Sequence, residues 1–178
     1  MGFRNHRRLA FTLAFVLTGG FMTGCGGDKA AQDEVDLAPI AISDHEGAVC
    51  GMLVREQSAP RSQVIHRDGE RSFLCSIGDL LAYLAAPSPH GAPARVLVEV
   101  LQPTQDPAES HTATHPWITA QEGVYVVGIE RKLVMGAPVL IYRDRAAAEQ
   151  VIAGTSAKIL SWDELGSWWA KQQGGTPH

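Results

Sequence analysis

A cysteine and a methionine stand two positions apart in the sequence Val49-Cys50-Gly51-Met52. In a β-strand the side chains at i and i+2 project from the same face, with Cα atoms about 6.6 Å apart. A thiolate and a thioether placed in this way can converge on one ion, and such soft ligands select Cu(I). Two interpretations follow: Cys50 and Met52 bind Cu(I), or they are ordinary buried residues of a strand.

A further soft ligand could come from the few other methionines of the chain. Of the four methionines in the chain, Met1 and Met22 belong to the N-terminal segment, which leaves Met52 and Met135. Met135 precedes a glycine in an apolar loop sequence and is predicted to supply a third soft donor.

The N-terminal segment, residues 1–24, has the layout of a lipoprotein export signal. A stretch with three arginines precedes a short apolar run, 9–17, and a series of small residues. The run is too short to span a membrane. The sequence Met22-Thr23-Gly24-Cys25-Gly26 follows and predicts that a lipid is attached to Cys25, which becomes the mature N-terminus. An uncleaved anchor helix is the alternative.

The part of the chain that follows this signal is acidic. Removal of residues 1–24 takes away three arginines and no acidic residue, so the formal net charge changes from -4 to -7. Sequence-independent binding to nucleic acid needs many basic contacts to phosphates, and this composition argues against it. Residues 25–44 are small, polar and acidic, which predicts a flexible tether between the lipid anchor and a folded domain at 45–172.

Cys75 is the main complication for a thiolate site in an exported domain. An oxidising compartment favours a Cys50–Cys75 disulfide if the two Cα atoms come within about 7 Å of each other. Such a bond would remove the thiolate ligand. Cys75 is otherwise a second thiolate or simply a buried residue, and the sequence leaves all three interpretations open.

The folded part is predicted to be α+β, with two similar ββαβ lobes packed together, because one unit of this size buries a face poorly. In lobe one, 45–102, we expect strands at 48–55, 62–67 and 95–101 and a helix that starts at the Ser76–Asp79 capping box and ends at Pro87. In lobe two, 115–165, we expect strands at 124–128, 139–142 and 158–161, a helix over 144–154, and a second capping box at Ser161 and Glu164 before a final helix.

Signals of enzymes are scarce in this sequence. It contains no Gly-rich phosphate loop, no nucleophile elbow, no His-Glu-x-x-His and no Cys-x-x-Cys motif. Two or three soft donors without an evident fourth ligand suggest a metal carrier and not a structural metal site. We therefore expect a protein that is not an enzyme.

Several short motifs together resemble one known family. They are, in order, the lipobox at Cys25, Cys50-Gly51-Met52, Gln63-Val64, Phe73-Leu74-Cys75-Ser76 with Asp79-Leu80-Leu81-Ala82-Tyr83, Trp117, Tyr125-Val126-Val127-Gly128 and Met135-Gly136. This set is similar to the NosL family of copper-carrying lipoproteins, which are associated with the maturation of nitrous oxide reductase. The resemblance extends from about Cys25 to Leu165.

The resemblance implies a periplasmic, lipid-anchored Cu(I) chaperone with a repeated ββαβ fold. Its implied partners are the copper-accepting maturation machinery or apo nitrous oxide reductase, and the lipid bilayer through Cys25. Gly26 after the lipidated cysteine favours the outer membrane. The family's Cys-x-Met pair corresponds to Cys50 and Met52, and its Met-Gly loop to Met135. The resemblance also implies a histidine ligand, for which His45, five residues before Cys50, is the candidate; His45 is otherwise a solvated loop residue.

Two other functions compete with the carrier. The family's architecture is related to organomercurial lyase, whose cleavage of carbon–metal bonds needs two cysteines and an acid around one metal. Cys50 and Cys75 could form that pair, but no motif identifies the acid. The third hypothesis is a structural or binding lipoprotein that holds no metal and has a Cys50–Cys75 disulfide.

Overall fold

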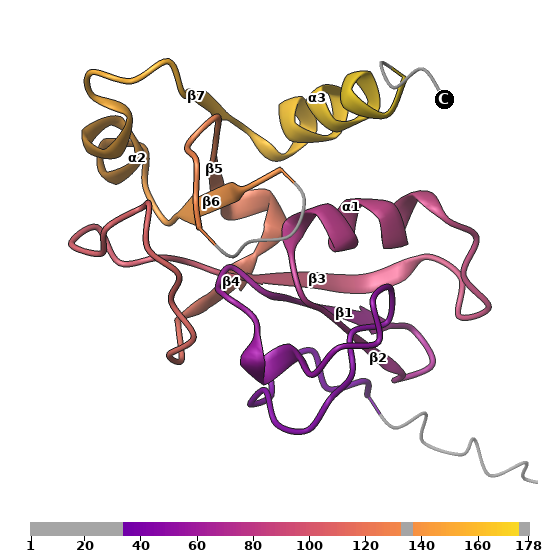
Figure 1. Ribbon diagram of the computed structural model, residues 1–178. Helices are drawn as coiled ribbons and strands as arrows, with labels where there is room; N and C mark the ends of the chain where they lie inside the picture. The colour runs from indigo at the N-terminus through magenta and orange to yellow at the C-terminus, as the bar shows by residue number, and fades with distance from the viewer. Residues whose placement is uncertain (1–33, 133–136, 175–178) are drawn as a thin grey trace, which may run out of the picture. The chain divides into compact units, whose positions relative to one another are not determined.

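In the computed structural model, residues 34–132 and 137–174 are described, and they form two antiparallel sheets and three α-helices (Figure 1). The first sheet has the strand order β2-β1-β3-β4. Its strands are β1 (Ser62–His66), β2 (Arg71–Leu74), β3 (Pro93–Glu99) and β4 (Trp117–Thr119). Helix α1 (Ile77–Ala85) connects β2 to β3. The helix begins where predicted, because the Ser76 side chain accepts a hydrogen bond from the backbone N–H of Asp79.

The second sheet repeats this arrangement with a new set of elements. It has the strand order β6-β5-β7, formed by β5 (Val124–Val127), β6 (Val139–Tyr142) and β7 (Lys158–Leu160). Helix α2 (Arg145–Ile152) connects β6 to β7 and is capped by the Asp144 side chain. In both sheets the first strand of the repeat lies between the second and the third. The predicted α+β fold with two ββαβ units is therefore confirmed.

The prediction of a strand at 48–55 is wrong. The chain there forms a turn, two isolated bridges and the 3₁₀-helix η1 (Val54–Glu56). Hydrogen bonds from Gly47 N to the Met52 carbonyl and from Gly51 N to the Gly47 carbonyl fold the segment back on itself. Gly51 has a φ of 69°, which glycine adopts at little cost. The two strands that open the first repeat are instead β1 and β2.

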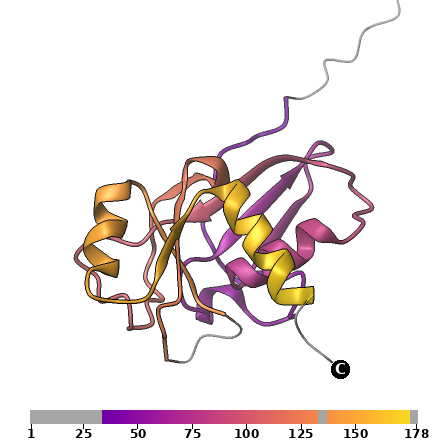
Figure 2. The same ribbon diagram turned by 90° about the horizontal axis from the view of Figure 1, so that it is seen from above.

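Both sheets contribute to one core, and the second sheet is covered on both of its faces. Tyr125 and Val127 of β5 pack with Leu80 of α1 and with Leu165 of α3 (Trp162–Gly174). Val126, between them, packs on the opposite face with α2. Figure 2 accordingly shows α2 on one side of the second sheet and α3 with α1 on the other. The short η2 (Ala120–Glu122) connects β4 to β5.

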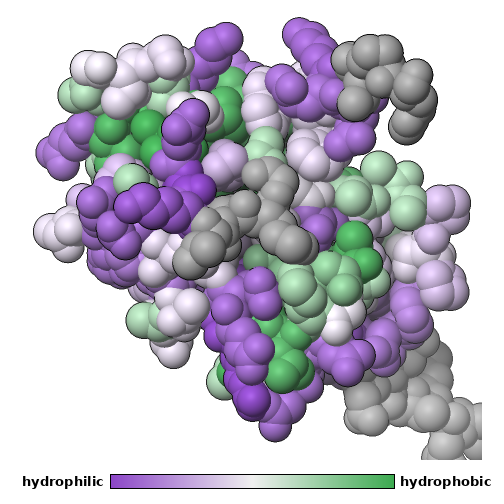
Figure 3. All heavy atoms as spheres, viewed as in Figure 1, coloured by the Kyte–Doolittle hydropathy of each residue, from purple (hydrophilic) through white to green (hydrophobic). Residues whose placement is uncertain are grey.

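On the surface, apolar residues form separate patches among hydrophilic ones. On the face drawn in Figure 3, the green patches are interrupted by purple side chains. Among the described residues, none of the helices is both long enough and apolar enough to span a bilayer.

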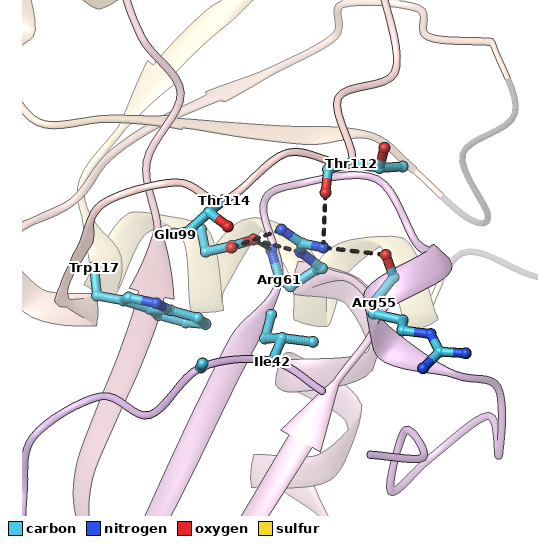
Figure 4. Close-up of a pocket in the computed structure, with 8 residues that line it drawn as sticks. Ile42, Arg55, Arg61, Glu99, Thr112, Thr114 and Trp117 are labelled. Atoms are coloured by element: carbon cyan, nitrogen blue, oxygen red, sulfur yellow. Dashed lines mark hydrogen bonds and ion pairs between the residues drawn. The ribbon is translucent and has the colours of Figure 1, made fainter. Parts of the chain in front are cut away.

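A buried ion pair between Arg61 and Glu99 attaches the first sheet to the connection between the repeats (Figure 4). Glu99 is the last residue of β3. Arg61, just before β1, donates from Nε to Glu99 Oε2 at 2.6 Å and from Nη2 to Glu99 Oε1 at 2.8 Å. The guanidinium also donates to the carbonyls of Thr112 and Ala113. Arg61 is 3% exposed and Glu99 1% exposed. A charge left alone in such a place would be strongly unfavourable.

We therefore expect Glu99→Gln to lower the free energy of unfolding by about 3–5 kcal/mol, because Arg61 would stay buried without its counter-charge. Urea unfolding followed by circular dichroism measures this loss. Glu149→Gln is the matched control, since its exposed pair with Arg145 should contribute less than about 1 kcal/mol. Equal effects of the two substitutions would contradict the role assigned to the buried pair.

Candidate metal site

The turn from Gly47 to Met52 lies against the face of β2 that is turned away from the main core. Leu74 packs in the core between the sheets, whereas its neighbour Phe73 packs on the opposite face with Val54 and Cys75. The backbone N–H of Ala48 donates to the Phe73 carbonyl at 2.9 Å and fixes the turn to the strand. The position of the turn thus depends on β2, an element far from it in the sequence.

This attachment brings two thiols together. The Sγ atoms of Cys50 and Cys75 are 3.0 Å apart, and both cysteines are free. Cys75 follows β2 directly, and Asp79 lies in the first turn of α1. The two sulfurs and one carboxylate oxygen of Asp79 all lie within 4.8 Å of one another, a grouping that could hold a metal ion.

The two thiols have different surroundings. Cys75 is 5% exposed, whereas Cys50 is half-buried, so solvent reaches the pair from the side of Cys50. Burial, then the hydrogen bond with Cys50, then the charges of Cys50 and Asp79 raise the pKa of Cys75 to about 12. The Oδ2 atom of Asp79 is buried and has no hydrogen-bond partner among the described residues. Asp79 Oδ2 is therefore free to face an ion, whereas Cys75 must first lose a proton that its surroundings favour.

Gly47 leaves the space that the two sulfurs occupy. A Cβ atom at this position would lie 2.6 Å from the Sγ of Cys75 and 2.7 Å from the Sγ of Cys50. Such distances are shorter than any real contact of a Cβ atom, so even alanine would push the thiols aside. The glycine is thus required by the close approach of the two side chains.

Of the other predicted ligands, Met52 lies beside the two thiols and His45 lies on Phe73. The half-buried Met52 packs against the cluster of Val54, Phe73 and Cys75, and its carbonyl is 3.7 Å from the Sγ of Cys75. The ring of His45 stacks on Phe73 with centroids 3.8 Å apart and does not belong to the group formed by Cys50, Cys75 and Asp79. Met135 and Cys25, the predicted site of lipidation, lie outside the described residues.

Sequence reasoning missed two members of this site. Asp79 was identified only by its place in the capping box and in the family motif, and neither signal reports what the side chain faces. Gly47 carried no signal at all, because its role depends on the approach of Cys75 from another element. Helical spacing gave no hint either, since Cys75 precedes the N-cap Ser76 and lies outside α1.

Gly47→Ala is expected to lower the free energy of unfolding by about 1–3 kcal/mol, because its Cβ overpacks the space beside the two sulfurs. The measurement is urea unfolding of the reduced protein. Gly166→Ala in α3 is the matched control: nothing lies within 4 Å of its added Cβ, so it should leave stability unchanged or raise it. If both variants were equally stable, the crowding at Gly47 would be disproved.

The raised pKa of Cys75 predicts a loss of stability at high pH. The pKa of this thiol is near the ordinary value of 9.0 in the unfolded chain but about 12 in the folded protein. The unfolded state then loses its proton first, so the free energy of unfolding should fall between these two values, by at most about 1.4 kcal/mol per pH unit. Cys75→Ser should decline less steeply over this range in urea unfolding. Cys50→Ser is the control that keeps most of the decline, because burial is the main cause of the shift.

Comparison with known proteins identifies the family. Residues 39–169 match the NosL family. The copper-binding lipoprotein NosL of Stutzerimonas stutzeri is 28% identical over 163 residues, which cover 90% of this chain and 82% of that protein. The crystal structure of the copper chaperone NosL from Shewanella denitrificans is similar with a TM-score of 0.59 and 25% identity, covering 71% of this chain and 94% of the other. The resemblance noted in the motifs is confirmed, and the chain belongs to the NosL family.

Proposed function

We propose that this protein is a Cu(I) carrier that delivers copper for the maturation of nitrous oxide reductase. The observation that supports it best is the pair of free thiols 3.0 Å apart at a half-buried position. The two relatives described as copper-binding and as a copper chaperone support the same reading. The chain would act as a carrier and not as an enzyme.

The ligands proposed for Cu(I) are the thiolate of Cys50 and the thioether of Met52. Thiolate and thioether are the protein ligands that monovalent copper prefers. Cys75 is close enough to Cys50 to add a second thiolate. Met135 and His45 are proposed as further donors, which would complete the coordination of the ion or shield it from solvent. The carboxylate of Asp79 is a hard ligand and contributes charge more than coordination.

Copper would leave the site by ligand exchange. A sulfur or imidazole of the acceptor enters the coordination sphere before the carrier's ligands leave, which requires a low coordination number and an accessible side. Cys50 is the more exposed of the two thiols and supplies that access. The acceptor would be the maturation machinery or apo nitrous oxide reductase, attracted in part by the acidic surface of the mature chain.

The carrier is proposed to work at the periplasmic face of a membrane, held by a lipid on Cys25. The lipobox sequence before Cys25 supports this, as does the description of the relative from Stutzerimonas stutzeri as a lipoprotein. Gly26 favours the outer membrane. The chain that leads from the anchor is bonded to the first sheet from Asp36 onward. Arg71 donates to the carbonyls of Asp36 and Ala38, and the Gln63 side chain bonds both the N–H and the carbonyl of Ile40.

A structural lipoprotein with a Cys50–Cys75 disulfide is the second candidate. The 3.0 Å approach of the two sulfurs favours it as well, because little movement would bring them to bonding distance. The thiol count of protein purified without reductant distinguishes the two functions. Two free thiols support the carrier, and none supports the bridge.

Cys50→Ser is expected to weaken Cu(I) binding by about 100-fold or more, since the thiolate is the strongest soft ligand of the proposed set. Competition with a chromophoric Cu(I) chelator measures the affinity. Wild-type affinity should also fall as the pH is lowered, because a thiol must lose its proton to bind. Met52→Leu, which keeps the volume of the side chain, should weaken binding by a smaller factor.

Two acidic residues provide a matched control for this experiment. Asp79 and Asp163 both lie in the first turn of a helix, α1 and α3 respectively. Neither Asp79→Asn nor Asp163→Asn should change the affinity for Cu(I) by more than a few-fold, because carboxylates are poor ligands for this ion. Unchanged affinity in a Cys50→Ser/Met52→Ala double variant would rule out the proposed site.

A further inference from the structure

A histidine pair at the end of β1 shares no residue with the sulfur site. His66 closes β1 and is completely buried, at 0% exposure. Its Nε2 lies 2.9 Å from the hydroxyl oxygen of Tyr83, which in turn lies 2.8 Å from the Oγ of Ser72. Its other ring nitrogen, Nδ1, is buried and has no hydrogen-bond partner among the described residues. One side of this imidazole is therefore held by the protein while the other lacks a partner.

His90 lies beside His66, and one of its two ring nitrogens is likewise bonded to another side chain. The ring centroids of His66 and His90 are 5.0 Å apart, with their planes at 41°. Nδ1 of His90 donates to Oδ2 of Asp68 at 2.7 Å, so in the neutral ring the lone pair is on Nε2. A carboxylate that accepts from the far nitrogen is the usual support behind a metal-bound imidazole. His90 keeps about a third of its side chain exposed, at 33%.

The spacing of the two rings is compatible with a shared metal ion. With metal–nitrogen bonds of about 2.0–2.1 Å and a tetrahedral angle, two imidazoles on one ion have centroids about 5 Å apart. The 5.0 Å observed here agrees with this value. A purely structural histidine at 0% exposure would normally have both nitrogens satisfied, because an unpaired buried nitrogen costs about 1–3 kcal/mol.

We propose that His66 and His90 form a second metal site, which binds a divalent ion that prefers imidazole, Cu²⁺ or Zn²⁺. The ligand atoms are Nδ1 of His66 and Nε2 of His90, and solvent on the exposed side of His90 completes the coordination. Tyr83 and Asp68 are positioning residues that hold the two rings. The site differs in chemistry from the sulfur site, since imidazole suits divalent copper and zinc whereas paired sulfurs suit Cu(I). It does not depend on the function proposed above.

The test uses the purified Cys25→Ser/Cys50→Ser/Cys75→Ser protein, which lacks all three cysteines of the chain, so that no thiol can bind or reduce the added ion. Titration with Cu²⁺ should give one equivalent whose electron paramagnetic resonance spectrum shows coupling to two imidazole nitrogens. His90→Gln in this background should weaken binding at least about 100-fold, and Asp68→Asn by about 10–100-fold. His111→Gln is the matched control, because the Nε2 of that histidine faces the Asp106 carbonyl and not the pair. It should change the affinity less than about 2-fold.

A second measurement needs no histidine variant and so does not depend on how the variants fold. Addition of Zn²⁺ to the same thiol-free protein should shift the imidazole resonances of His66 and His90 in nuclear magnetic resonance spectra and leave those of His111 in place. Affinity unchanged by His90→Gln, equal losses in His90→Gln and His111→Gln, or Zn²⁺ shifts spread over all histidines would each show adventitious binding only and overturn the proposal.

Discussion

The sulfur site depends on the close approach of two chain segments at a residue that has no side chain. Cys50 and Cys75 come within 3.0 Å because the turn at 47–52 is bonded to the Phe73 carbonyl and because Gly47 places only hydrogen beside the two sulfurs. Any larger residue there would separate the thiols or displace the turn. Packing at this point therefore controls how close the two potential ligands can come.

The first repeat, with the turn attached to it, carries the described residues of both proposed sites, and the second repeat supports it. Both candidate sites lie on the first sheet and α1: Cys75 and Asp79 bracket the start of the helix, and Tyr83 lies one turn further along. The second repeat instead buries Tyr125 and Val127 against that helix. Arg61 and Glu99 fix β1 and β3 to the connection between the repeats. The second repeat thus packs against the same helix that carries Asp79 and Tyr83.

Local signals predicted the elements that depend on nearby residues. The side chains of Ser76 and Asp144 cap α1 and α2, because each accepts a hydrogen bond from the backbone N–H three residues further on. The apolar run Val139–Tyr142 forms β6 with the predicted bounds. The strand expected at 48–55 failed because its apolar residues cover Phe73 from within a turn. A turn and a short strand bury similar residues, so composition alone does not distinguish them. Strand β4 was also not foreseen, since its three residues are ordered by pairing with β3.

The family and the ββαβ repeat could be inferred from motifs and periodicity, because these features depend on residues that are near one another in the sequence. The assignment of Cys50 and Met52 as ligands rests on the same kind of local signal and stays a prediction. The proximity of Cys75 and Asp79 to Cys50, the need for glycine at position 47 and the pairing of His66 with His90 could not be inferred in this way. These contacts join residues that are 20 or more positions apart or belong to different elements. They form only when the sheet and α1 are packed, so the three-dimensional fold decided which of the candidate side chains meet.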